Sequence, residues 1–292
     1  MKWLDEYRSS LKLPEVEEIL DIYFYRPIAF LIVKSVYSTR ITPDQLTFAA
    51  ITAGVTAGSF YASGTRTGSV AGALFFLLFN ILDCSDGQLA RLKKNGTPLG
   101  RILDGVADYI AEIAVFTGIA IGFCNNPDQP KHLLLLLALS GICIILQNIM
   151  VDYYRTRFLD YVLERKKTLE EELDEFEKEY DIIKTQKGKW LEKLLIGIYL
   201  RYSALQSGLT IKRKERKMLR ATASDYYRKN RVIIRFWVLM GPTAQITAMI
   251  LCSLFGRFDI FFWLILGVFN LLALVLRVIQ SRIDRSLIAV HI

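Results

Sequence analysis

The most prominent pattern along the chain is a series of long apolar stretches separated by shorter polar ones. Six stretches are rich in Leu, Ile, Phe, Gly and Ala: 44–63, 68–90, 102–124, 132–154, 232–255 and 258–278. Each has close to the ~20 residues that an α-helix needs to cross a bilayer. The pattern therefore predicts an all-α, polytopic membrane protein with six transmembrane helices.

A segment of mixed character precedes the first apolar stretch. Residues 15–38, "EVEEILDIYFYRPIAFLIVKSVYS", interleave apolar side chains with charged ones, as a helix lying on a membrane surface does. Pro27 is expected to bend this amphipathic helix. Thr42 and Pro43 then supply an N-cap and a first helical residue, which marks the start of the first span.

One large polar segment, residues 156–231, interrupts the apolar pattern. It begins with the acidic run "LEEELDEFEKEYD" and becomes basic at "IKRKERKMLR" and "YYRKNR". A solvated helical hairpin over the cytoplasmic face is the simplest interpretation, and a regulatory or partner-binding role is the alternative. The chain then divides into an N-terminal segment (1–41), helices one to four (42–155), the insertion (156–231) and helices five and six with a tail (232–292).

The net charge of +8 raises the question of nucleic-acid binding. The basic residues gather in the links after the second and fourth apolar stretches, whereas "SGTRTG", "NNPDQPK" and "GRFD" are nearly neutral. Cytoplasmic loops of membrane proteins carry an excess of Lys and Arg, so both termini and the links with basic residues are expected in the cytoplasm. Anionic membrane lipids then explain the charge, and nucleic acid is not an expected partner.

Cysteine and histidine offer no catalytic pattern. Cys84, Cys124, Cys143 and Cys252 are scattered through the predicted spans without metal-ligand spacing, which argues against disulfides and zinc. His132 and His291 lie far apart along the chain and in the predicted topology. A histidine-based catalytic site is therefore not expected.

The acidic residues, in contrast, do form a pattern, because four aspartates lie within the most apolar part of the chain. The segment "DCSDGQLARLKKNGTPLGRILDGVAD" occupies residues 83–108. Asp83 and Asp86 are three residues apart on one predicted helix, and Asp104 and Asp108 are four apart on the next, so each pair shares a helix face. Two neighbouring helices joined by a short link can therefore direct four carboxylates into one space.

Four carboxylates in one space repel one another and lose hydration, so they need partners. Divalent cations with a preference for oxygen, Mg²⁺ above all, meet this need and also bind substrate phosphates. Two such ions would balance four negative charges and could hold a diphosphate. Two alternatives remain: structural ion pairs with Arg91, Lys93, Lys94 and Arg101, and an ion-coupled transporter. A transporter is expected to have midplane charges and inverted repeats, which the chain does not show.

The complete motif is more specific than its acids. It reads D-x2-D-G-x2-A-R-x8-G-x3-D-x3-D and resembles the signature of the CDP-alcohol phosphotransferase (CDP-alcohol phosphatidyltransferase) family. The eight matching positions are Asp83, Asp86, Gly87, Ala90, Arg91, Gly100, Asp104 and Asp108. The resemblance implies an integral-membrane enzyme of phospholipid biosynthesis, which moves a substituted phosphoryl group from a CDP-linked donor to an alcohol and releases CMP. It also implies a homodimer and dependence on Mg²⁺ or Mn²⁺, with two ions expected.

The resemblance also assigns roles to the motif residues. Asp83, Asp86 and Asp104 would hold metal ions and the nucleotide diphosphate. Asp108 would be the base that deprotonates the acceptor hydroxyl, and it is a candidate metal ligand as well. The remaining four residues would complete the nucleotide pocket with Asp83 and Asp86: Gly87, Ala90, Arg91 and Gly100.

The substrates are the least determined part of the prediction. CDP-diacylglycerol with a soluble acceptor fits six spans and a surface helix, and a soluble CDP-alcohol (choline, ethanolamine or inositol type) with a lipid or polyol acceptor is the alternative. Arginines at the cytoplasmic ends of the last three spans suit a phosphorylated polyol, because guanidinium binds phosphate through two parallel hydrogen bonds. An inositol or inositol-phosphate acceptor is therefore predicted, with glycerol phosphate and serine as competitors. The candidate acceptor residues are Asn148, Asp152, Arg155, Arg235 and Arg282.

Overall fold

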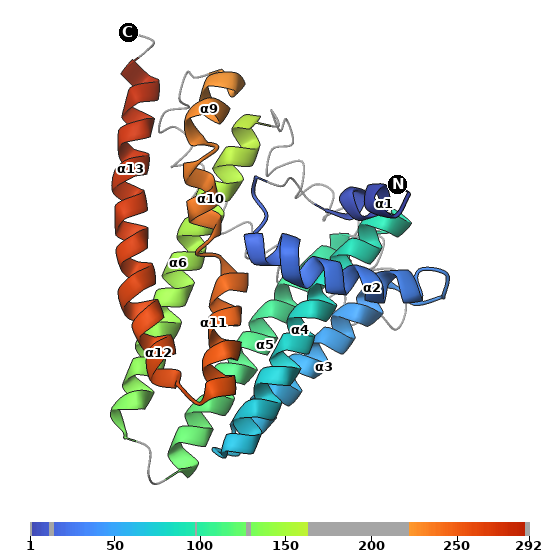
Figure 1. Ribbon diagram of the computed structural model, residues 1–292, viewed down its shortest axis with the longest axis vertical. Helices are drawn as coiled ribbons and strands as arrows, with labels where there is room; N and C mark the ends of the chain where they lie inside the picture. Colours follow the sequence, from blue (N-terminus) through green and yellow to red (C-terminus); the bar gives the residue numbers. More distant parts are fainter. Residues whose placement is uncertain (1, 12–14, 97, 127–129, 163–221, 290–292) are drawn as a thin grey trace, which may run out of the picture.

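The protein is seen in a computed structural model that describes residues 2–11, 15–96, 98–126, 130–162 and 222–289. All regular structure in these ranges is helical, which confirms the predicted all-α class (Figure 1). Five helical segments are long and apolar enough to cross a membrane: Arg66–Lys93, Leu103–Asn125, His132–Val162, Ile233–Phe255 and Phe258–Leu287. The described residues therefore form a polytopic membrane protein.

The first predicted span forms helix α3 (Pro43–Tyr61), but this helix is less apolar than the five segments above. Its composition is dominated by Ala, Gly and Thr, and it packs against α4 (Arg66–Lys93) and α5 (Pro98–Asn125). A Cβ on Gly58 would lie only 2.3 Å from the Ala114 carbonyl oxygen of α5, so small residues let the two backbones approach. Five crossings are supported by length and composition, and the sixth stays a prediction.

The start of α3 is confirmed in detail. The Thr42 hydroxyl accepts a hydrogen bond from the Gln45 backbone N–H at 3.3 Å, and the Gln45 side chain accepts one from the Thr42 N–H at 3.2 Å. This capping box satisfies two N–H groups that the first helical turn leaves without partners, and Pro43 follows the cap as expected.

The fifth apolar stretch is broken rather than continuous. Helix α10 (Ile233–Val238) ends before Gly241, and α11 (Pro242–Phe255) begins after it. Pro242 has no N–H to continue the helix, and the carboxylate of Glu18 accepts hydrogen bonds from the next two N–H groups, those of Thr243 at 3.2 Å and Ala244 at 3.0 Å. A side chain from the N-terminal segment therefore caps the start of α11.

The fourth and sixth apolar stretches form helices that continue beyond their predicted ends. Helix α6 (His132–Val162) continues past 154, and α12 (Phe258–Trp263), the π-helical η2 (Leu264–Phe269) and α13 (Asn270–Ala289) follow one another without a gap. Residues 156–162 of the predicted insertion thus belong to α6, and α9 (Ala223–Asn230) lies near its end. Residues 163–221, with the acidic run and "IKRKERKMLR", lie outside the described residues.

The N-terminal segment crosses one end of the helical bundle (Figure 1). It contains α1 (Lys2–Ser10), the π-helical η1 (Asp21–Tyr25) and α2 (Arg26–Val36), and Pro27 follows the junction of the last two. Helix α2 buries Phe30 and Val33, while Leu31 is 61% exposed, so it is amphipathic as predicted. Its place on a membrane surface stays a prediction.

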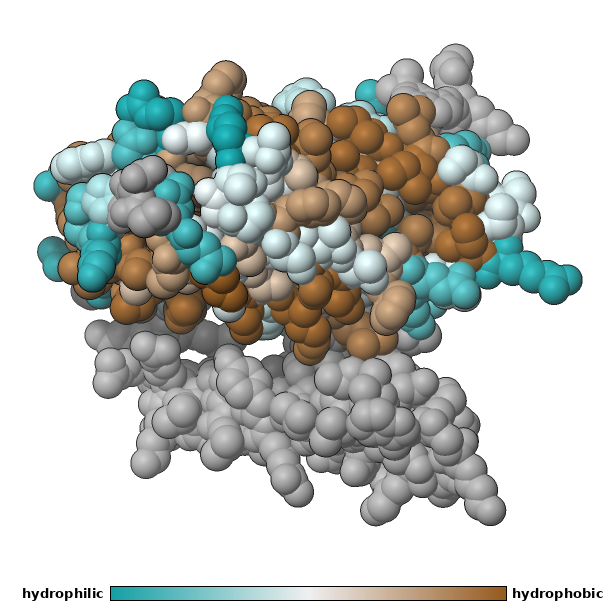
Figure 2. All heavy atoms as spheres, turned by 90° about the horizontal axis from the view of Figure 1, so that it is seen from below, coloured by the Kyte–Doolittle hydropathy of each residue, from teal (hydrophilic) through white to brown (hydrophobic). Residues whose placement is uncertain are grey.

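Hydrophobic clusters fill the interior of the described part of the chain, and two of them are the largest. One joins α3, α4, α5, α6, α11 and α12 through residues such as Phe79, Val115 and Phe262, and the other surrounds Trp237 and Tyr226 near α9 and α10. Many apolar side chains are also exposed on the outside of the helices. The view from below shows apolar surface together with polar surface (Figure 2). Because apolar outer faces are costly in water, this surface fits contact with lipid. Exposed examples are Ile142, Ile145 and Ile149 on α6 and Leu271 and Leu274 on α13.

Candidate active site

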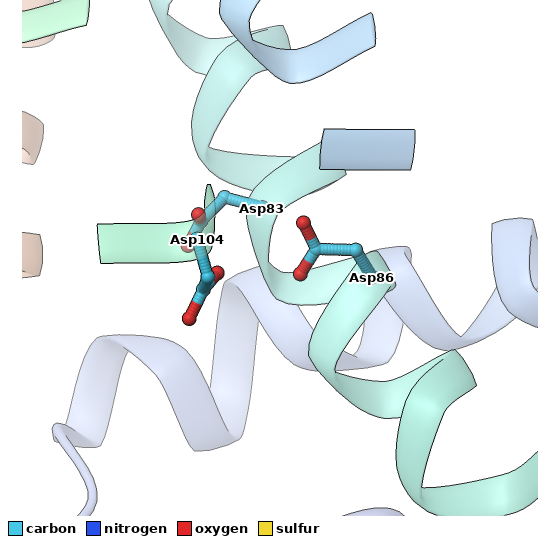
Figure 3. Close-up of side chains that lie close together, drawn as sticks. All are labelled: Asp83, Asp86 and Asp104. Atoms are coloured by element: carbon cyan, nitrogen blue, oxygen red, sulfur yellow. The ribbon is translucent and has the colours of Figure 1, made fainter. Parts of the chain in front are cut away.

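Three of the four motif aspartates meet between α4 and α5 (Figure 3). Asp83 and Asp86 come from successive turns of α4, and Asp104 comes from α5. One carboxylate oxygen from each lies within 4.8 Å of the others. The helix-face argument from spacing therefore predicted this convergence correctly for three residues.

Asp86 is the innermost of the three. Its side chain is only 3% exposed, and its Oδ2 accepts a hydrogen bond from the hydroxyl of Thr47 on α3 at 2.5 Å. Thr47 is itself 4% exposed and lies on the face of α3 that carries Ala50 and Gly54. Thr47 was not predicted from the sequence. The available signal was its position three residues before Ala50 and seven before Gly54, which places it on the same helix face as these small residues.

Asp108 is placed differently. It lies one turn beyond Asp104 on α5, its side chain is exposed, and it is not part of the three-carboxylate group. The structure thus brings together three of the four predicted metal ligands. The roles predicted for Asp108, as base and as additional ligand, stay predictions.

The three carboxylates fit a divalent cation. Their like charges oppose one another at this separation, and burial of Asp86 removes the water that would screen it. A set of hard carboxylate oxygens is what Mg²⁺ and similar ions prefer in proteins. The donor atoms are therefore suited to hold such an ion, with Asp83, Asp86 and Asp104 as ligands.

Two of the four cations in the ion-pair alternative have contacts with the N-terminal segment. Arg91 donates its Nε–H to the Ser10 carbonyl at 2.5 Å. Lys93 donates to the carbonyls of Thr39 and Ile41 at 3.1 and 2.8 Å. Both side chains therefore help to hold the N-terminal segment against α4, and the ion-pair alternative stays open.

The predicted nucleotide-binding residues lie around the same end of α4. A Cβ on Gly87 would find only the Arg91 guanidinium nitrogens near it, at 3.5 Å, which is ordinary contact. Packing of the described residues therefore does not require a glycine there, and the open backbone is available to a ligand. Ala90 is half-buried one turn further along, and Gly100 lies in the first turn of α5.

The predicted acceptor residues come from three helices, α6, α10 and α13. Asn148 and Asp152 are one turn apart on α6; the Asn148 Oδ1 is buried without a hydrogen-bond partner among the described residues, and Asp152 is exposed. Arg155, also on α6, lies close enough to lower the pKa of Glu18. Arg235 lines a separate hollow beside the N-terminal segment, and Arg282 is exposed on α13.

Glu18 has an unusual environment in the same region. Burial raises the pKa of its carboxyl to about 8, and the nearby Asp21 adds to the rise. The hydrogen bonds from the Thr243 and Ala244 N–H groups oppose it, as does the charge of Arg155. The cap of α11 is therefore a protonation-sensitive contact.

Comparison with known proteins agrees with this architecture. Residues 40–171, which include α3 to α6 and all the motif residues, match the family model described as CDP-alcohol phosphatidyltransferase. The match covers less than half of the chain and agrees with the family that the motif resembles.

Several curated relatives match part of this chain. The phosphatidylinositol phosphate synthase of Corynebacterium glutamicum is 30% identical over 131 residues, 45% of this chain and 55% of the relative. The protein of the same name from Mycobacterium tuberculosis is 30% identical over 149 residues, 50% of this chain and 62% of the relative. The ceramide phosphoethanolamine synthase of Drosophila melanogaster is 31% identical over 118 residues, 37% and 30% of the two chains. The chain thus spans about three fifths, or slightly less, of these synthases from bacteria.

Proposed function

We propose that the protein is an integral-membrane transferase that moves a phosphatidyl group from CDP-diacylglycerol to an alcohol and releases CMP. The convergence of Asp83, Asp86 and Asp104 inside the region that matches the CDP-alcohol phosphatidyltransferase family carries this proposal. The apolar outer faces of the surrounding helices suit a donor with two acyl chains, because such a donor reaches the site from within the bilayer.

The proposed transfer reaction needs a metal site and a base, and the motif aspartates can supply both. The three clustered aspartates would hold a divalent cation, Mg²⁺ or Mn²⁺, which when bound neutralises charge on the diphosphate. Asp108 takes the proton from the acceptor hydroxyl. The acceptor oxygen forms a bond to the phosphorus that carries diacylglycerol, the bond from that phosphorus to the bridging oxygen breaks, and CMP leaves with the electron pair.

An inositol phosphate is the acceptor we propose. Two of the relatives are named phosphatidylinositol phosphate synthases, and Arg155 on α6 supplies a guanidinium suited to a phosphate. Asn148 offers a buried Oδ1 without a partner among the described residues, which can accept a hydrogen bond from a polyol hydroxyl. Asp152 lies one turn away on the same helix.

Two ions, a homodimer and a cytoplasmic active site belong to the same proposal. The described helices α1 and α9 and the end of α13 lie toward the same end of the molecule (Figure 1). Described basic residues of the links contact these elements, Arg91 at Ser10 of α1 and Arg157 at Asp284 of α13, which supports a cytoplasmic placement of the site.

Purified protein incubated with labelled CDP-diacylglycerol, Mg²⁺ and a panel of acceptors tests the proposal. We expect CMP release and a labelled lipid product with inositol phosphate. Asp83→Asn and Asp104→Asn should abolish both, whereas Asp44→Asn, which removes an exposed carboxylate in the first turn of α3, should not. Turnover of CDP-ethanolamine with a lipid acceptor, and none of CDP-diacylglycerol, would reverse the donor assignment.

A further inference from the structure

A hollow of about 470 Å³ opens between the N-terminal segment and the chain around α10. Glu15 and Ile19 come from the N-terminal segment, and the other lining residues are Tyr227, Arg231, Val232, Arg235, Phe236 and Leu239. The lining includes none of the three clustered aspartates. Its size is within the range of ligand-binding pockets, and nothing in the proposed reaction uses it.

Two guanidinium groups give this hollow its charge. Arg231 and Arg235 are one turn apart, both are exposed, and neither has a hydrogen-bond or ion-pair partner among the described side chains. Glu15 faces them across the hollow and accepts a hydrogen bond from the Tyr227 hydroxyl at 3.3 Å. Two positive groups against one negative group leave the lining net positive, which favours an anionic ligand.

The rest of the lining is apolar. Val232 is 60% exposed, Phe236 is 48% exposed, and Leu239 continues the same face of the chain one turn beyond Arg235. Ile19 completes the apolar surface from the N-terminal segment. A free phosphate or a phosphorylated polyol gains nothing from these side chains, whereas an amphiphile buries its hydrocarbon against them.

The position of the hollow relative to the nearby apolar span agrees with an amphiphilic ligand. The apolar span that contains α10 and α11 begins at Ile233, so Arg231 lies just outside it and Arg235 lies in its first turn. Lipid phosphates lie at this boundary between water and hydrocarbon, and arginines there bind them. The arginines are thus at the level of lipid head groups, and Leu239 is at the level of the acyl chains.

We propose that this hollow is a binding site for an anionic glycerophospholipid of the bilayer, with its phosphate on Arg231 and Arg235 and an acyl chain along Val232, Phe236 and Leu239. This gives Arg235 a different role from the acceptor contact predicted from the sequence. Because Glu15 and Ile19 come from the segment that caps α11, the bound lipid links the N-terminal segment to α10.

Thermal unfolding of the full chain in detergent tests this proposal without relying on catalysis. Added phosphatidylglycerol should raise the Tm, because a ligand of the folded state stabilises it. Phosphatidylcholine with the same acyl chains and inorganic phosphate should not. The phosphatidylglycerol shift should disappear in the R231Q/R235Q double variant and persist in R285Q, which removes an exposed arginine of α13 from outside the hollow.

An equal shift in R231Q/R235Q, or equal shifts from phosphatidylcholine or inorganic phosphate, would overturn the proposal. If the double variant does not fold, R235K and R235Q can be compared by native mass spectrometry for retained phosphatidylglycerol. Retention by R235K and loss by R235Q is expected, because lysine keeps the positive charge. Equal retention by both would also overturn it.

Discussion

The hydroxyl of Thr47 holds the carboxylate of Asp86 from a helix that contributes no acid to the site. Asp86 is the most deeply buried of the three clustered aspartates, and Thr47 is buried beside it. A charged hydrogen bond of this kind fixes the direction of a metal-binding carboxylate, so α3 controls the geometry of a site built on α4 and α5.

Replacing Thr47 should therefore impair the site without removing a ligand. In Thr47→Val the shape is kept and the donor is lost, and we expect activity or metal affinity to fall by about 10- to 100-fold. CMP release measured over a range of Mg²⁺ concentrations checks this. Thr47→Ser should restore most of the activity. Thr52→Val is the matched control, because Thr52 is an exposed threonine of α3 that donates only to Phe48. Equal effects of Thr47→Val and Thr52→Val would exclude a specific role for Thr47.

Metal removal gives a second prediction. Because Asp83, Asp86 and Asp104 lie within 4.8 Å of one another, a nucleotide diphosphate needs a cation to bind beside them. CMP or CDP should raise the Tm in the presence of Mg²⁺ or Mn²⁺ and leave it unchanged with excess chelator. Asp104→Asn should lose this metal-dependent shift. A nucleotide shift of the same size in chelator would contradict the site.

Asp108 can be tested by separating binding from turnover. If it is the base, Asp108→Asn should lose at least ~10²-fold in turnover, the lower range for a general base. Donor and metal binding, followed by the thermal shift with nucleotide, should remain. A parallel loss of nucleotide binding would make Asp108 chiefly a metal ligand, despite its place outside the three-carboxylate group.

The buried cap formed by Glu18 predicts a dependence of stability on pH. The pKa of this carboxyl rises from an ordinary value of 4.5 to about 8 on folding, so the folded state binds its proton more tightly. The stabilisation of the folded state by this proton is complete below about pH 4.5 and is lost as the pH rises through about 8. In wild type this lowers the Tm as the pH rises from 5 to 9, and in Glu18→Gln the decrease should be smaller. Glu6→Gln, at a partly exposed acid of α1 paired with Lys34, should leave the slope unchanged. The same slope in wild type and Glu18→Gln would exclude Glu18 as its source.

The close contact of α3 with α5 predicts a packing defect. A Cβ on Gly118 would lie 2.0 Å from the Gly58 carbonyl oxygen, so Gly118→Ala must push the two helices apart. We expect a loss of about 1–3 kcal/mol in stability, as for other overpacked interiors. Gly267→Ala is the control, because no atom lies within 4 Å of a Cβ built there. Equal unfolding temperatures for the two variants would show that the contact relaxes without cost.

The helices and three site aspartates were predictable because their signals are local. Apolar length defines a span, Thr42 followed by Pro43 marks a helix start, and a spacing of three places Asp83 and Asp86 on one face. Thr47 was missed because its partner is on another helix, and no local pattern says which faces of two helices meet. The break before α11 was missed for the same reason: Pro242 suggests an interruption, but the capping carboxylate of Glu18 is remote in sequence.

The large sequence separation between Glu18 and the start of α11 has a consequence for biosynthesis. Glu18 is separated by 225 residues from the Thr243 N–H that it caps, and Tyr25 by 222 residues from the Thr247 hydroxyl it bonds at 2.8 Å. The ribosome has therefore made α3 to α6 before either partner exists, and Glu18 and Tyr25 must wait for these contacts until α11 is made. Glu18 and Tyr25 are translated before α3 but reach these two contacts only after α11 is made, so the formation of these contacts reports the completion of most of the fold.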